Sequence, residues 1–202
     1  KSLIIHNQKL ETAVDFLNKA ISSSNDISGA VILPNDSTMP GSKLNIHKTF
    51  QLNDLKHDGS ITAIRIEGSK NSIDYRIENL IKELQIINSN ISILEVNQSE
   101  IFWNKIKSLE FFTDPRSSLM RIVIPPSEAV PLIYQLSGNF KYYLDWGGAL
   151  IWLEVFELSE GMFQSIRKKV VKLGGYVTMI KNSNHLPYVE DIFTINRERF
   201  NI

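Results

Sequence analysis

The sequence predicts an α+β protein made of two consecutive βαββαβ units, which are ferredoxin-like, with antiparallel sheets and helices on one face. Short β-branched runs alternate with segments whose apolar residues recur at helical spacing. The order strand, helix, strand, strand, helix, strand occurs twice along the chain. A composition of 43% hydrophobic and 22% charged residues over 202 residues is that of a globular protein with a sizeable core.

The first unit is expected over residues 1–96. Residues 2–6 form a short β-branched strand, residues 10–21 an amphipathic helix, and residues 27–33 (ISGAVIL) a second strand. Residues 34–60 carry Pro, Gly, Asn, Asp and Ser with little periodicity and predict the longest loop. A third strand at 61–67, a helix capped by Asn71 or Ser72, and a fourth strand at 91–96 complete the unit.

A linking helix is expected over residues 97–117, because Asn97 and Glu100 have capping-box spacing ahead of an apolar stripe. The second unit, residues 118–181, places strands at 119–124, 141–146, 149–156 and 176–180. Its two helices are capped by Ser127 and Ser159. Residues 182–202 indicate an irregular segment followed by the beginning of a helix.

Two glycines punctuate the second unit. Gly147 and Gly148 stand between two β-rich runs, which is typical of a tight hairpin whose turn needs positive φ.

Helices on one side of the sheet would leave the other face free to cover a second domain, a partner or a ligand.

Charge and composition exclude several classes of function. The 22 basic residues balance the 22 acidic ones, so no overall field favours nucleic acid or an anionic membrane. The absence of Cys excludes disulfides, thiolate metal sites and a Cys nucleophile. No apolar run has the length of a transmembrane segment, and the first residues do not resemble a signal peptide. We therefore expect a cytoplasmic protein that binds no nucleic acid.

The sequence contains no complete catalytic set. None of the four histidines, His6, His47, His57 and His185, has a metal-ligand partner at helical spacing, so no metal is expected. Glycine-rich phosphate loops and the GxSxG motif of serine hydrolases are also missing from the sequence. We assign no catalytic residue.

Two arginines and two tryptophans remain as candidates. Arg121 interrupts the apolar strand LMRIVI, where its guanidinium must reach water or bind an anion such as a carboxylate. Arg65 is in a similar position but can pair with Glu67 on the same strand face. Trp146 and Trp152 flank the glycine pair and are either sheet packing or part of a surface over a flat partner.

The order of several motifs resembles the C-terminal half of the FAD-binding subunit of glycolate oxidase, within the FAD-linked oxidases of the vanillyl-alcohol oxidase type. LMRIVIPPSEAVPL, LDWGGALIWL and KLGGYVTMIKN resemble the family segments (L/W)WR(L/I)S(L/V)PP, WGGALRWL and GGHATL, in that order. In the first half, ISGAVILP and ITAIRIEGSKNSIDYRIENL are similar to (V/I)SGAAHLP and L(L/V)RLEG with its following helix. The resemblance covers nearly the whole chain, and WGGALxWL is its most distinctive part.

Four positions depart from the family pattern. Met120 stands where the family has Trp, Val123 where it has Ser, Ile151 where it has Arg, and Tyr176 where it has His. The substrate- or flavin-facing candidates that the resemblance implies are Arg121, Trp146, Gly147, Gly148 and Trp152.

The resemblance implies the cap, or substrate, domain of an oxidase that transfers hydride from a small 2-hydroxy acid to FAD. The family's N-terminal flavin-binding domain and its closing FDPxxxxNPGR segment are absent from these residues, so we expect a fragment that is inactive alone and does not retain FAD. The implied partners are the N-terminal FAD-binding domain of the same parent chain, a sister flavoprotein subunit and an iron–sulfur subunit. Any membrane association would come through that complex. A ferredoxin-like regulatory module that binds a small molecule without catalysis remains the alternative.

Overall fold

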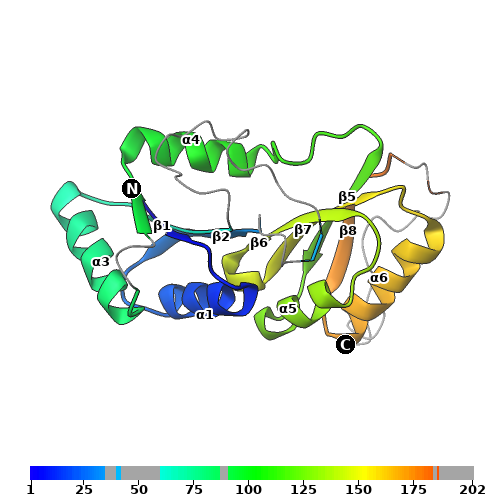
Figure 1. Cartoon of the computed structure of the whole chain (residues 1–202), viewed down its shortest axis with the longest axis horizontal. Helices are drawn as coiled ribbons and strands as arrows, with labels where there is room; N and C mark the ends of the chain where they lie inside the picture. The colour runs from blue at the N-terminus through cyan, green and yellow to red at the C-terminus, as the bar shows by residue number, and fades with distance from the viewer. Residues whose placement is uncertain (35–39, 42–59, 87–90, 184–185, 187–202) are drawn as a thin grey trace, which may run out of the picture.

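A computed structural model describes residues 1–34, 40–41, 60–86, 91–183 and 186 (Figure 1). The expected α+β class and the order of two βαββαβ units are confirmed. The first unit and the linking helix comprise β1 Ser2–His6, α1 Leu10–Ile21, β2 Ile27–Leu33, β3 Ile61–Ile66, α3 Lys70–Glu83, β4 Ile91–Leu94 and α4 Val96–Lys107. The second comprises β5 Ser117–Val123, α5 Pro126–Tyr134, β6 Phe140–Asp145, the 3₁₀ turn η2 Trp146–Gly148, β7 Leu150–Phe156, α6 Glu160–Lys172 and β8 Tyr176–Lys181.

The two units share one antiparallel sheet of eight strands, in the order β4-β1-β3-β2-β6-β7-β5-β8. Each unit contributes four neighbouring strands, and the halves meet where β2 pairs with β6. Two residue pairs make this β2–β6 junction: Val31 with Asp145 and Ile32 with Leu144.

Helices lie on both faces of the sheet. The four helices of the two units, α1, α3, α5 and α6, cover one face, while α4 crosses the other (Figure 1). The core is correspondingly split, with Leu3, Ile32 and Met120 buried on the four-helix side, and Ile4, Val31 and Leu119 on the α4 side.

The expectation that the second face is free is therefore wrong over much of the sheet. The linking segment carries four large apolar side chains that need burial, and it places them over the sheet. Phe102 and Ile106 of α4 are buried there, and Phe111 and Phe112 contact Tyr143 of β6. Phe112 stacks on the Tyr143 ring at a centroid distance of 5.4 Å.

Several expected helix caps are displaced. The N-cap of α3 is Ser69 rather than Asn71 or Ser72, and that of α5 is Pro125 rather than Ser127, because proline is favoured in the first helical turn. The capping contact of α4 uses Glu95 and Gln98, two residues before the expected pair, with Gln98 Oε1 accepting the Glu95 N–H at 3.2 Å.

The predicted Ser159 cap is correct, since its Oγ accepts the Met162 N–H at 3.2 Å. The predicted loop falls largely on residues 35–39 and 42–59, outside the described residues, as do His47, His57, His185 and most of the segment 182–202.

The glycine pair forms the predicted turn between β6 and β7. Gly147 and Gly148 have φ values of 65° and 95°, in the left-handed region that glycine tolerates best. Both are buried against helices: a Cβ on Gly147 would collide with Asn18 of α1, and one on Gly148 would lie 3.0 Å from the Cβ of Ala129 in α5. The turn therefore requires glycine for its conformation and for the space.

We expect Gly147→Val and Gly148→Val each to lower the free energy of unfolding by about 1–3 kcal/mol, through backbone strain and crowding. Gly161→Ala in α6 is the control, because an added Cβ there meets no atom within 4 Å. It should leave stability unchanged or raise it by up to about 1 kcal/mol. Chemical denaturation of the three variants tests this, and parental stability of both valine variants would contradict the turn geometry.

Candidate functional site

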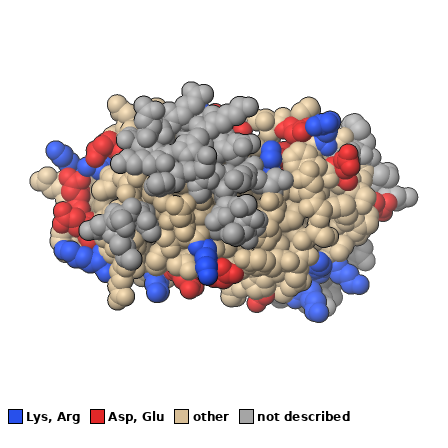
Figure 2. Space-filling model, viewed as in Figure 1, with Lys and Arg blue, Asp and Glu red and all other residues tan. Residues whose placement is uncertain are grey.

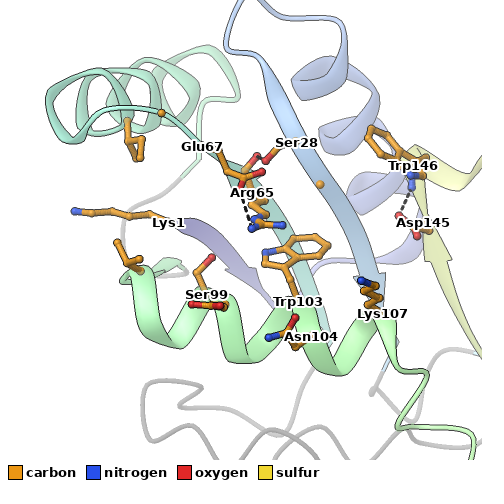
Figure 3. Close-up of a pocket in the computed structure, with 15 residues that line it drawn as sticks. Lys1, Ser28, Arg65, Glu67, Ser99, Trp103, Asn104, Lys107, Asp145 and Trp146 are labelled. Atoms are coloured by element: carbon orange, nitrogen blue, oxygen red, sulfur yellow. Dashed lines mark hydrogen bonds and ion pairs between the residues drawn. The ribbon is translucent and has the colours of Figure 1, made fainter.

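A groove of about 820 Å³ lies between α4 and the sheet, and we call it the α4 groove (Figure 3). Its walls come from β2 and β3, from the exposed side of α4, and from the end of β6 with the first residue of η2. It therefore reaches from the first unit across the β2–β6 junction to the second.

The spacing of residues in α4 explains why this helix forms a groove rather than a closed lid. Phe102 and Ile106 are buried against the sheet, whereas Glu100, Trp103 and Lys107 form a neighbouring stripe that lines the groove. The helix carries one apolar stripe for packing and one polar and aromatic stripe for the cavity.

Hydrogen bonds hold α4 at its distance from the sheet. Trp103 Nε1 donates to Ser2 Oγ of β1 at 2.8 Å, and that hydroxyl lies 2.7 Å from Ser99 Oγ. The Trp103 ring also sits against Gly29 of β2, where an added Cβ would come within 3.0 Å of it. The indole thus occupies a fixed place in the wall of the groove.

Arg65 and Glu67 confirm the ion pair expected from the sequence. Arg65 Nη2 lies 2.8 Å from Glu67 Oε1, and both residues line the groove. The Arg65 charge is therefore compensated within the protein.

Asp145 brings a carboxylate to the opposite end of the groove, beside Trp146 (Figure 3). Its Oδ1 accepts the backbone N–H of Trp146 at 2.8 Å. Burial raises the pKa of Asp145 to about 6, an effect opposed by this hydrogen bond and by the positive charge of Arg121. Among the described residues Asp145 has no ion-pair partner, so its second oxygen remains available.

Trp146 has a backbone conformation that is unfavourable for a residue with a large side chain. Its φ of 48° lies in the left-handed region, which is rare for aromatic residues. The residue is 46% exposed and lines the groove, so core packing does not account for this conformation. Strain of this kind, on the order of 1–3 kcal/mol, is concentrated at functional sites.

The structure separates the five sequence-based candidates into three places. Arg121 and Trp152 are direct cross-strand neighbours in β5 and β7, on the α4 side of the sheet. Trp146 lines the α4 groove, whereas Gly147 and Gly148 are buried against α1 and α5. The glycines are thus turn residues, and only Arg121, Trp146 and Trp152 present side chains to the α4 side.

Metal chemistry finds no support in the described residues, which contain no cluster of three or more His, Asp or Glu side chains suited to a metal ion. His6 is buried with Nε2 2.9 Å from Ser92 Oγ, as expected for a structural histidine. Basic and acidic side chains of the described residues are interspersed on the face in Figure 2, without a large patch of one sign.

Sequence reasoning missed Asp145, Lys107 and Trp103. Asp145 directly precedes the WGG motif, and Lys107 follows Trp103 by one helical turn, but neither spacing is distinctive. Only the crossing of α4 over the sheet brings these residues into one cavity.

Comparison with known proteins assigns no family to this chain. No family model matches its sequence, and no curated protein is significantly similar to it. Within the described residues, no helix is long and apolar enough to cross a membrane.

The raised pKa of Asp145 predicts how the stability of the fold depends on pH. A carboxyl whose pKa is higher in the folded state destabilises the fold as the pH rises through the interval from about 4 to about 6. At about pH 7.5 we expect Asp145→Asn to raise the free energy of unfolding by roughly 1–2 kcal/mol, since the amide keeps an acceptor for Trp146. The gain should disappear near pH 4, where Asp145 is protonated.

Urea denaturation across this pH range provides the measurement. Asp15→Asn is the matched control, because Asp15 lies on the exposed side of α1, and this change should have little effect on stability at either pH. Equal or lower stability of Asp145→Asn at about pH 7.5 would contradict the burial cost.

Proposed function

We propose that this chain is the cap domain of an FAD-linked oxidase subunit that acts on a small 2-hydroxy acid, similar to the FAD-binding subunit of glycolate oxidase. The observation that carries the proposal is the cross-strand pair of Arg121 and Trp152 on the α4 side of the sheet. Both belong to motifs on which the resemblance rests, and Arg121 has no ion-pair partner among the described residues.

The surroundings of Arg121 suit an anionic partner. Val123 and Leu150 form the next half-buried pair in the same register, and Tyr176 and Ile180 of β8 are 40% and 47% exposed. Together with Trp152 they form a strip that contains one guanidinium and is apolar except for Thr178, the neighbour of Arg121 in β8; we call it the Arg121 strip. The planar fork of an arginine binds a carboxylate through two parallel hydrogen bonds, so the carboxylate of a 2-hydroxy acid fits this environment.

The strip also fits a flat cofactor presented by another domain. Aromatic and aliphatic side chains around a single arginine can lie over a planar ring system and contact one of its oxygen atoms. The chain has no glycine-rich phosphate loop, so FAD would be held by the N-terminal domain of the parent polypeptide. In this proposal the present residues would position the substrate carboxylate and exclude water, and FAD held by the other domain would supply the hydride acceptor.

The proposal includes a cytoplasmic complex with a sister flavoprotein subunit and an iron–sulfur subunit. The second candidate function is a regulatory module that binds a small molecule without catalysis. The α4 groove favours it, because that cavity has aromatic and charged walls of its own and Arg121 is not among the residues that line it.

We expect the purified 202-residue chain to be folded and colourless, because it lacks the loop that supplies most of the affinity for a dinucleotide. Absorbance spectroscopy and circular dichroism after incubation with excess FAD and desalting test this. Folded protein that retains stoichiometric flavin would contradict the assignment of flavin binding to another domain.

We expect Arg121→Lys to lower glycolate-dependent dye reduction by the assembled oxidase at least tenfold, because an ammonium group cannot reproduce the two-pronged contact. The variant should melt within a few degrees of the parent, because Arg121 is only half-buried and lysine keeps its charge, so the change costs about 0.5 kcal/mol or less. Arg116→Lys is the control, because the Arg116 side chain is 84% exposed and pairs with Asp114. Unchanged turnover in Arg121→Lys would remove Arg121 from the site, and an assembled protein without flavin or dye reduction would refute the oxidase assignment.

A further inference from the structure

We propose that the α4 groove binds a free α-amino acid, with the ligand's ammonium group at Asp145 and its carboxylate at Lys107. The groove is lined by residues other than those of the Arg121 strip, so this site does not depend on the proposed oxidase function. Four residues that line the groove define the proposed site: Asp145, Lys107, Trp103 and Trp146.

Asp145 is the natural partner for a cation. One of its oxygens is used by the Trp146 N–H, and the second has no partner among the described residues although the carboxyl lines the groove. A half-buried carboxylate with an unused oxygen gains from a ligand ammonium group that replaces lost water. Arg121 partly offsets the charge of Asp145 but forms no ion pair with it, so among the described residues no side-chain cation occupies the position at the second oxygen.

Two indole rings line the same cavity as this carboxylate. Trp103 is fixed by its hydrogen bond to Ser2 and its contact with Gly29, and Trp146 lies next to Asp145 in the chain (Figure 3). Indole faces attract cations and also provide apolar contact for the carbon skeleton of a ligand. Trp146, whose φ lies in the left-handed region, forms part of the groove wall.

Lys107 supplies the opposite charge. It lies one turn after Trp103 on the groove stripe of α4, and no ion pair or hydrogen bond to another described residue involves it. Arg65, in contrast, is compensated by Glu67. Lys107 is therefore the cation better placed to bind a ligand carboxylate.

A carboxylate at Asp145 and an ammonium group at Lys107 together favour a zwitterionic ligand over a simple acid or amine. A 2-hydroxy acid would bring a carboxylate to Lys107 but leave Asp145 without a positive partner, and a simple amine would leave Lys107 without a negative one. An α-amino acid carries both charges on one carbon atom, and a cavity of about 820 Å³ has space for its side chain as well.

The experiment is a titration of the 202-residue chain at about pH 7.5 with each common L-amino acid in turn. Tryptophan fluorescence and isothermal calorimetry measure the binding. Glycolate and ethylamine are probes that each lack one of the two charges. We expect saturable binding of at least one amino acid, and binding at least tenfold weaker for both single-charge probes. Asp145→Asn and Lys107→Gln should each weaken the amino acid at least tenfold, with Lys168→Gln on the exposed side of α6 as the charge-matched control.

Folding of the variants is checked by their melting temperatures, and Asp145→Asn should be at least as stable as the parent. Absence of binding by every amino acid at millimolar concentration would overturn the proposal. Binding that survives both substitutions would overturn the assigned contacts. Glycolate binding as tight as the best amino acid would also overturn it, and would instead identify the groove with a hydroxy-acid site. Arg121→Lys should keep the amino-acid affinity within twofold of the parent value. A failure of the amino-acid site can therefore be distinguished from a failure of the oxidase proposal.

Discussion

The pairing of β2 with β6 is the interaction on which the rest of this structure depends. Each βαββαβ unit alone would expose one of these strands as an unpaired edge, with free backbone groups and apolar side chains. Two residue pairs join these strands and turn two small sheets into one. The same junction brings the end of β6 and its turn against α1 and α5, and it places Asp145 opposite Val31, at the wall of the α4 groove.

The linking helix is the second determinant, because it has two different functions on two neighbouring stripes. Phe102 and Ile106 complete the core on the side of the sheet that lacks the four unit helices, and Tyr143 donates its hydroxyl to the Ile106 carbonyl oxygen at 3.2 Å. The stripe with Trp103 and Lys107 instead leaves a cavity between helix and sheet. A helix that buries one stripe in this way leaves the neighbouring stripe to line a groove.

Two features of the groove oppose stability. Burial of the Asp145 carboxyl disfavours its charged form, and Trp146 adopts a backbone conformation that glycine or asparagine would adopt more easily. Both occur where β6 ends, beside the cavity and not within the core. Perturbed carboxyl groups and strained residues that coincide in a cleft are typical of ligand sites. The Arg121 strip has a different character, since it combines one arginine with apolar neighbours and resembles a surface for covering another domain.

The sequence by itself determined the local elements, because each depends on contacts between residues close in the chain. Apolar periodicity placed α1 and α6, the glycine pair located the turn after Asp145, and strand alternation predicted the pairing of Arg65 with Glu67. Tertiary structure decided the joining of the two sheets, the face that α4 covers, and the meeting of Lys107, Trp103 and Asp145 in one cavity. These outcomes depend on which apolar surfaces pair across long separations in the chain, and the periodicity of a single segment contains no information about its distant partner.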